Sequence, residues 1–219
     1  LGQAPARQAA IGAGIPSESG ATTINKMCGS GMKSIMFGHD SIKAQQNNIV
    51  VAGGLENMTN APYILSKARK GFRMGHADVK DHMFLDGLED AYEEGKLMGS
   101  FAEDTAEHYQ FTREQQDNFA ITSLERAKKA NEDGTFESEI VPIKILDRKN
   151  EIIINKDEQP FKSDITKIPT LKPAFRKNGT VTAANSSSIS DGASSVILML
   201  ESEAPVSYTH LRAHETVHY

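Results

Sequence analysis

Cys28 is the residue whose type and position most directly suggest chemistry, and it is the single cysteine among the 219 residues. It stands between a short β-prone run, residues 22–25, and a helix-prone run that begins at Gly29. A helix N-terminus stabilises a thiolate through its unpaired backbone N–H groups and its dipole, and so lowers the cysteine pKa from about 8.5. Gly29 and Gly31 lack a Cβ, so we expect the backbone to turn sharply there and let a ligand approach the sulfur. This setting is typical of a nucleophile.

Position alone leaves a second interpretation of Cys28 open. Many unpaired cysteines are small buried apolar residues without a chemical role. From the spacing by itself, the nucleophile and the packing residue are equally supported. A single cysteine also excludes an internal disulfide, which fits a reducing compartment.

Motifs elsewhere in the chain bear on this choice because they follow one another in a recognisable order. Residues 25–33 (NKMCGSGMK) resemble the nucleophile motif of the thiolase family, and residues 50–63 resemble that family's strand and Gly-Gly turn. The remaining matches are residues 97–99, 114–117, 172–175, 179–185 and 191–193. The resemblance covers the chain from Leu1 to about Ala204, and it favours the nucleophile.

The resemblance implies an α/β protein with a partial thiolase fold, in which the first α/β domain is incomplete and the second is absent. Residues 1–57 and 190–204 are expected to belong to the first domain, and residues 58–189 to a loop domain that binds coenzyme A. The chain starts with Leu1 in place of an initiator methionine, so its start reads as a cut. Residues 205–219 resemble a translated sequencing adapter, and we expect them to be a non-native tail.

A candidate zinc site falls in this expected tail. His210, His214 and His218 recur every four residues, which on a helix places three imidazoles on one face. Helical histidine pairs at this spacing do bind zinc. Because these histidines lie in the expected tail, and the other histidines show no ligand spacing, we expect no metal site.

The activity implied by the resemblance is acyl transfer between coenzyme A thioesters. Cys28 would accept an acetyl group from acetyl-CoA, and a carbanion from a second acetyl-CoA would then give acetoacetyl-CoA, or the reverse thiolysis would occur. The carbanion step needs a base and an oxyanion hole. The family motifs that supply them, Asn-Glu-Ala-Phe, Gly-His-Pro and Cys-x-Gly-Gly, do not occur in this sequence. We therefore expect this chain alone to be inactive.

Coenzyme A thioesters are expected as substrates, with no permanently bound cofactor. The resemblance assigns a set of residues to the pantetheine and adenine pocket, and Lys162 to a position that contacts the nucleotide. The pocket residues are Leu88, Met98, Ala174, Phe175, Ala183, Ser187 and Ile189. A basic stretch at residues 63–80 would suit the phosphates of coenzyme A, although a solvated surface loop explains each of its charges equally well. Residues 165–169 are similar to eukaryotic acetoacetyl-CoA thiolases, which favours acetyl-CoA as the substrate.

Composition excludes several other classes. The 24 Lys and Arg against 29 Asp and Glu give a net charge of −5, so no broad basic face for nucleic acid is indicated. No apolar run approaches the roughly 20 residues of a membrane helix. The family implies a homotetrameric parent protein, and a cytoplasmic or mitochondrial location stays open. A thiolase-like protein that binds acyl-CoA or lipid without turnover is the main alternative. A ketoacyl synthase is disfavoured by the matches after Gly54.

The elements that must position these residues follow from periodicity and capping signals. We expect helices at residues 5–13, 29–46, 100–109 and 112–131, the last with a capping box made by Thr112 and Gln115. We expect strands at residues 22–25, 48–52, 139–146, 151–155, 180–184 and 194–200, of which 139–146 and 151–155 form a hairpin-like pair around a polar turn. A strand, a helix and a strand over residues 22–52 predict a βαβ unit in a parallel layer, with Cys28 beyond the carboxyl end of the first strand.

Overall fold

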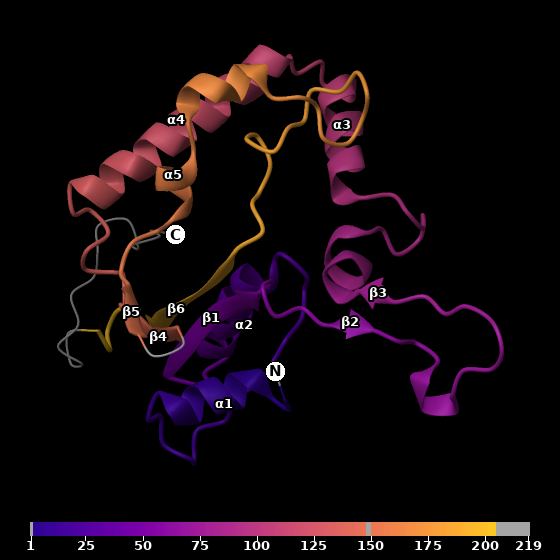
Figure 1. Ribbon diagram of the computed structural model, residues 1–219. Helices are drawn as coiled ribbons and strands as arrows, with labels where there is room; N and C mark the ends of the chain where they lie inside the picture. The colour runs from indigo at the N-terminus through magenta and orange to yellow at the C-terminus, as the bar shows by residue number, and fades with distance from the viewer. Residues whose placement is uncertain (1, 148–149, 205–219) are drawn as a thin grey trace. The chain divides into compact units, whose positions relative to one another are not determined.

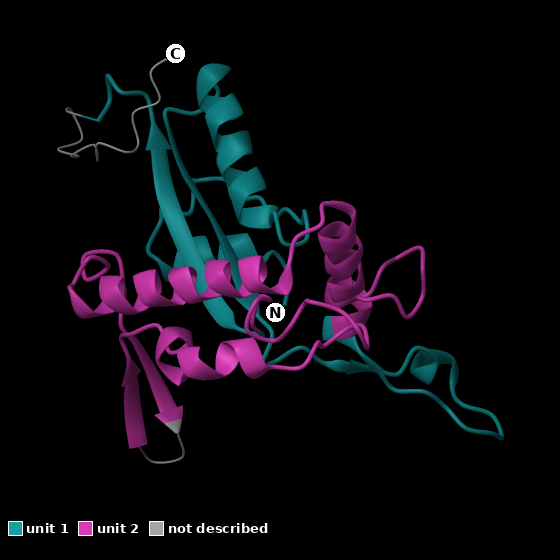
Figure 2. Ribbon diagram, turned by 90° about the horizontal axis from the view of Figure 1, so that it is seen from above, with its two compact units in different colours: residues 1–83, 189–219 teal, residues 84–188 magenta. Residues whose placement is uncertain are grey.

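The computed structural model of the chain describes residues 2–147 and 150–204 (Figure 1). The chain divides into two compact units: unit 1 is Leu1–Met83 together with the segment that begins at Ile189, and unit 2 is Phe84–Ser188 (Figure 2). Residues 58–83 are thus grouped with unit 1 by their contacts. Their assignment to a coenzyme-binding loop domain rests on the resemblance and stays a prediction.

Unit 1 is built around a long antiparallel strand pair, β1 and β6, and the helix α2. In chain order its elements are α1 (Pro5–Gly12), α2 (Ser30–Lys43), β1 (Ile49–Asn57), β2 (Tyr63–Ile64), η1 (Ala68–Lys70), β3 (Lys80–Asp81) and β6 (Asp191–Met199). The Thr59 N–H donates to Asp191 Oδ1 at 3.0 Å, which ties the chain leaving β1 to the start of β6.

Helix α2 packs on one face of the β1–β6 pair. A Cβ on the buried Gly38 would lie 2.7 Å from Leu198 Cδ1 and 3.1 Å from Val50 Cγ1, so the helix approaches the sheet as closely as a glycine permits. Successive side chains alternate between the two faces of a strand. Val51 and Ile197 therefore lie on the opposite face, where they are 52% and 64% exposed.

The predicted βαβ unit with a parallel layer is wrong within the described residues. Residues 22–25 form no strand, and each of the three two-stranded sheets found in the described part of the chain is antiparallel. A strand needs a neighbouring segment to accept and donate its backbone hydrogen bonds. No described segment does so for residues 22–25, and β1 pairs instead with β6, which is distant in sequence.

Unit 2 combines helices with one hairpin. In chain order its elements are the π-helical turn η2 (Phe84–Leu88), α3 (Met98–His108), α4 (Arg113–Glu132), β4 (Ile143–Asp147), β5 (Asn150–Ile154), α5 (Gln159–Lys162) and the 3₁₀ segment η3 (Ile165–Thr170). Strands β4 and β5 pair in antiparallel register, which confirms the predicted hairpin.

Local sequence signals define the start of α4. The Thr112 hydroxyl accepts from the Gln115 N–H at 3.2 Å, and the Gln115 side chain accepts from the Thr112 N–H at 2.9 Å. This is the predicted capping box, and it satisfies two backbone donors that a helix N-terminus otherwise leaves unpaired. The predicted strand at residues 180–184 is wrong, because this segment is a loop.

Within residues 2–147 and 150–204, none of the helices combines the length and the apolar character of a membrane-spanning segment. Over the same residues, no group of three or more His, Cys, Asp or Glu side chains is placed to hold a metal ion. His210, His214 and His218 lie outside the described residues.

Candidate active site

Cys28 lies in a tight turn directly before α2. Gly29 is the N-cap residue of α2, and its N–H donates to the Lys26 carbonyl at 3.1 Å. The Ser30 hydroxyl accepts from the Lys26 N–H at 2.9 Å and donates to the Met27 carbonyl at 2.6 Å. One side chain thus fastens two successive residues of the turn. Cys28 itself is exposed, so its sulfur can be reached from solvent.

The sharp bend beside Cys28 occurs at Met27 and not at the neighbouring glycines. Met27 has φ of +47°, in the left-handed region that residues with a Cβ rarely adopt. Its N–H donates to Asn25 Oδ1 at 2.8 Å, which helps to hold this conformation. Gly29 has φ of −92°, and Gly31 lies within α2. The expectation that these glycines make the turn is therefore wrong.

Gly31 serves instead as a packing contact with β1. A Cβ on Gly54 would lie 3.1 Å from the Gly31 Cα, so the backbones of α2 and β1 nearly touch here. The Ser34 hydroxyl donates to the Gly53 carbonyl at 2.9 Å, one turn further along the helix. These contacts fix the first turns of α2 on the sheet, and with them the turn that carries Cys28.

The residues that the resemblance assigns to coenzyme A binding are spread over several elements. Leu88 ends η2, Met98 begins α3, Lys162 ends α5, Ala174 and Phe175 follow η3, and Ala183, Ser187 and Ile189 lie between η3 and β6. All except Ile189 belong to unit 2. The structure brings some of them together and leaves others apart.

Leu88 and Met98 are brought close by the backbone. Glu89 and Leu97 form an isolated antiparallel bridge, and in this register Leu88 and Met98 are the next two residues opposite each other. Leu88 is half-buried, and Met98 is 42% exposed. The bridge therefore places two apolar side chains near each other at the start of α3.

Phe175 and Ala174 are held against α3 and the loop after Gly179. A Cβ on Gly99 would overlap the Phe175 ring, so this ring lies directly on the first turn of α3. The Ala174 N–H donates to the Val181 carbonyl at 2.9 Å. That bond places Ala174 beside the loop that carries the exposed Ala183.

Among the described residues, no hydrogen bond or ion pair joins Lys162, Ser187 or Ile189 to this group. Lys162 pairs with Glu158 on its own helix at 3.4 Å, and both side chains are well exposed. Ser187 and Ile189 are exposed in the segment leading to β6. Their roles in binding remain predictions.

Two buried carboxylates near this group were not singled out from the sequence. Glu103 on α3 is 3% exposed, and Asp117 on α4 is 4% exposed. Glu103 accepts from the Thr180 N–H at 2.9 Å and from the Val181 N–H at 2.9 Å. It thus takes up two backbone donors that have no strand partner.

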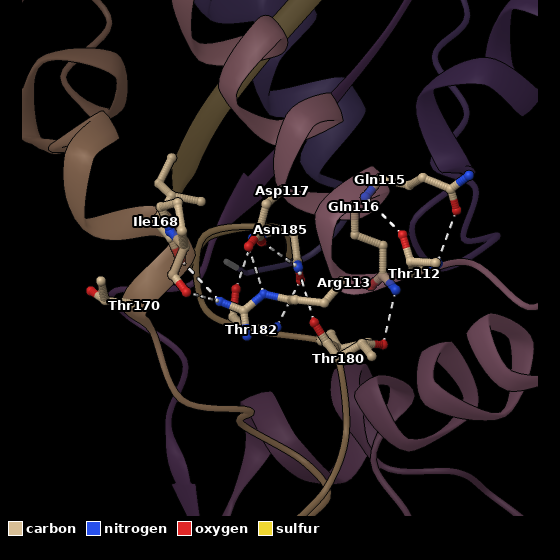
Figure 3. A network of polar contacts seen from close by, with 12 residues as sticks. Thr112, Arg113, Gln115, Gln116, Asp117, Ile168, Thr170, Thr180, Thr182 and Asn185 are labelled. Atoms are coloured by element: carbon tan, nitrogen blue, oxygen red, sulfur yellow. Dashed lines mark hydrogen bonds and ion pairs between the residues drawn. The ribbon is translucent and has the colours of Figure 1, made fainter.

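Asp117 connects α4 to the same loop (Figure 3). Its Oδ2 accepts from Arg113 Nε at 2.6 Å, and its Oδ1 accepts from Asn185 Nδ2 at 3.2 Å. Asn185 Oδ1 in turn accepts from the Thr182 N–H at 2.7 Å. Arg113 also donates to the Ile168 carbonyl at 3.0 Å, so the network reaches η3.

A sequence signal for these carboxylates existed. Glu103 and Ala106 are both buried and three residues apart, so they share the buried face of α3. Asp117 likewise begins a half-buried stripe that continues at Ala120 and Leu124. An acidic residue within a buried helical stripe needs partners, because an unpaired buried charge is costly.

An exposed ion-pair cluster includes Asp104 and Glu107 of α3. Arg176 pairs with Asp104 and, at 3.0 Å, with Glu107, and Lys96 lies 3.6 Å from Asp104. The hydrogen bond from Arg176 holds the pKa of Asp104 below its ordinary value, and the charges of Arg176 and Lys96 act in the same direction. Pairs this exposed contribute little to stability individually.

Comparison with known proteins decides the family. Residues 1–202 match the family described as "Thiolase, N-terminal domain". The chain belongs to the thiolase family. It is 51% identical over 205 residues to a probable acetyl-CoA acetyltransferase of Dictyostelium discoideum, covering 93% of this chain and 49% of that protein. It is also 51% identical over 202 residues to acetyl-CoA acetyltransferase 2 of Arabidopsis thaliana, covering 91% of this chain and 50% of that protein.

Solved thiolase structures agree with this result. A thiolase from Ascaris suum in complex with coenzyme A matches with a TM-score of 0.85 at 38% identity, covering 96% of this chain and 53% of that one. The acetyl-CoA acetyltransferase from Bacillus anthracis matches with a TM-score of 0.87 at 40% identity, covering 95% and 52%. The predicted α/β class and partial thiolase fold are confirmed. The chain spans about half the length of the curated relatives it matches.

Proposed function

We propose that this chain carries the nucleophile and part of the coenzyme A site of an acetyl-CoA acetyltransferase. The observation that supports the proposal most strongly is Cys28, exposed in a braced turn before α2, in a chain about 50% identical to proteins named acetyl-CoA acetyltransferase. A protein that only binds acyl-CoA does not need an exposed thiol in such a turn.

The first half-reaction follows from ordinary thioester chemistry. The Cys28 thiolate attacks the carbonyl carbon of acetyl-CoA, a new S–C bond forms, and the coenzyme A thiolate leaves with the electron pair of the broken bond. In the second half-reaction, the α-carbon of another acetyl-CoA loses a proton and attacks acetyl-Cys28, which releases acetoacetyl-CoA and the free thiolate. Thiolysis is the same sequence in reverse.

The second half-reaction needs a base and an oxyanion hole, and the motifs to which the resemblance assigns them do not occur in this sequence. A base must remove the α-proton, and hydrogen-bond donors must stabilise the enolate as it forms. Cys28 is the single cysteine, so no second thiol in this chain can act as the base. We propose that this chain alone does not carry out the condensation, and that the parent protein does so as a homotetramer in the cytoplasm or in mitochondria.

We propose that coenzyme A lies over the apolar side chains at the start of α3 and over the loop after Gly179. Leu88, Met98, Phe175 and Ala183 would line its pantetheine and adenine parts, an arrangement suited to a long, thin, partly apolar ligand. Lys162 would contact the nucleotide. Coenzyme A thioesters would thus act as substrates and not as permanently bound cofactors.

Acetylation of Cys28 tests the enzyme interpretation directly. The parent protein, expressed at the length of its relatives, would be incubated with acetyl-CoA, digested with trypsin and analysed by mass spectrometry. The peptide of residues 27–33 is expected to carry one acetyl group, and a Cys28→Ala variant is expected to carry none there. Binding of acetyl-CoA without this adduct would favour the thiolase-like binding protein.

The proposed inactivity of the isolated chain has its own test. The 219-residue chain would be mixed with acetoacetyl-CoA and coenzyme A, and the loss of acetoacetyl-CoA would be followed over time. We expect a rate no greater than that of the Cys28→Ala variant. Thiolysis by the isolated chain that depends on Cys28 would refute our account of the missing base.

A further inference from the structure

The loop of residues 179–187 is ordered by side chains in place of a neighbouring strand. The Thr180 and Val181 N–H groups donate to Glu103, and the Thr182 N–H donates to Asn185. Val181 and Thr182 are buried, with 5% and 0% of their surfaces exposed. Buried backbone donors without acceptors would be costly, so these side chains determine where the loop lies.

The carboxylates that hold this loop are carried by helices. Glu103 comes from α3 and Asp117 from α4, and the charge of Asp117 is compensated by Arg113 at 2.6 Å. Gln116 adds a bond from Nε2 to the Thr180 hydroxyl at 2.8 Å. The loop is therefore attached at several points to two helices of the same unit. Such a network holds one conformation better than isolated contacts do, because breaking one bond leaves its partner unpaired.

The exposed residues of the loop follow directly from the anchored ones. Ala183 comes immediately after the buried Thr182, and Ser187 lies two residues beyond Asn185. The Ala174 N–H donates to the Val181 carbonyl, so the anchored loop also holds Ala174 and the neighbouring Phe175. Residues predicted to contact coenzyme A thus lie next to residues held by the network.

We infer that Asn185 and Asp117 are positioning residues for coenzyme A binding, acting by holding the loop of residues 179–187 in the conformation that presents its exposed side chains to the ligand. This inference rests on the proposed function. The bond between Asn185 Nδ2 and Asp117 Oδ1 is its central contact, because it joins the loop to the charged group on α4.

The Asn185→Asp substitution tests this contact with almost no change of volume. It keeps an oxygen to accept from the Thr182 N–H, but it replaces the Nδ2 donor by an oxygen that faces Asp117 Oδ1 and the Thr180 carbonyl. Repulsion should loosen the loop. In the 219-residue chain, titrated calorimetrically with coenzyme A, we expect binding about tenfold weaker or worse. Exposed Asn118 lies on α4, so Asn118→Asp makes the same charge change as a control.

Rescue distinguishes positioning from a general loss of structure. Asp117→Asn supplies an amide donor, so in the Asn185→Asp background it restores an attraction across the same contact. We expect the double variant to recover part of the lost affinity, although each single substitution weakens binding. Amide hydrogen exchange at residues 180–182 should be faster in each single variant than in the unsubstituted chain, and partly slowed again in the double variant. Exchange along α4 should stay unchanged.

The outcomes separate the inference from the proposed function. If the unsubstituted chain does not bind coenzyme A, the proposed binding role fails, and hydrogen exchange at residues 180–182 still tests the anchoring. Affinity and exchange in Asn185→Asp equal to those of Asn118→Asp would overturn the inference. If Asn185→Asp unfolds the chain, Thr180→Val serves instead, since it removes only the hydroxyl contacts that tie the loop to Gln116 and Glu103. Weaker binding by this folded variant supports the inference, and unchanged binding overturns it.

Discussion

A methyl group added at Gly179 tests the buried carboxylate of Glu103. A Cβ at this position would lie 2.5 Å from Glu103 Cδ and closer still to Oε1. Gly179 is not in the left-handed region, so alanine meets no backbone penalty there. The Glu103 side chain cannot turn aside cheaply, because its oxygens hold the Thr180 and Val181 N–H groups. Gly179→Ala should therefore displace the carboxylate from the loop.

The expected cost follows from the bonds that are lost. Two backbone donors would lose a charged acceptor, and each such bond contributes about 1.5–3 kcal/mol in a buried setting. Thr180 is only half-buried, so water should replace part of its loss. We expect the free energy of unfolding to fall by about 3 kcal/mol.

Urea unfolding, followed by circular dichroism, measures this loss when the slope of the transition is unchanged. Gly87→Ala is the matched control, because a Cβ there meets no atom of another segment within 4 Å and the residue lies in the same unit. We expect the control to stay within about 0.5 kcal/mol of the unsubstituted chain. In a Glu103→Ala background, Gly179→Ala should add little further cost, because the clash is gone. Equal stabilities of Gly179→Ala and Gly87→Ala would refute the reasoning.

Three further predictions concern helix capping, pH and the turn beside the cysteine. Thr112→Ala removes the capping box with Gln115 and should lower the free energy of unfolding by about 1 kcal/mol in thermal melts; no loss would contradict the capping role. Arg176 lowers the pKa of Asp104 in the folded chain, so the pair contributes stability above the unfolded pKa and loses it as pH falls through the folded pKa. NMR titration should accordingly show a higher Asp104 pKa in Arg176→Gln, and an unchanged pKa would contradict the pairing. Met27→Val places a β-branched residue at φ of +47° and should cost about 1 kcal/mol or more in urea, whereas Met27→Gly should cost less; the reverse order would contradict the assigned strain.

Elements that depend on local signals were predictable from the sequence. The capping box of α4 needs only Thr112 and Gln115 three residues apart, and the structure forms it as predicted. The hairpin β4–β5 needs only two apolar runs around a polar turn. Helix α2 begins one residue after the predicted start, directly following Cys28 and Gly29. In each case the deciding contacts lie within a few residues of one another.

The turn at Cys28 shows where local reasoning stops. Glycines are the usual residues for a sharp bend, and two flank the cysteine. In the structure the bend falls on Met27, because Asn25 and Ser30 hydrogen-bond the turn in that conformation. Gly31 is required for another reason, its contact with Gly54. That contact joins segments far apart in the sequence, so no pattern around Cys28 reveals it.

The loop after Gly179 is the clearest case of tertiary contacts outweighing propensity. Thr180, Val181 and Thr182 are residues that favour strands, and they predict one. Their N–H groups instead bond to Glu103, 77 and 78 residues away, and to Asn185. In a strand within a sheet, the backbone groups on both edges of this segment would hydrogen-bond to neighbouring strands. Held by a carboxylate on one side, the segment still leaves the next residue, Ala183, exposed to solvent, as the proposed contact with coenzyme A requires.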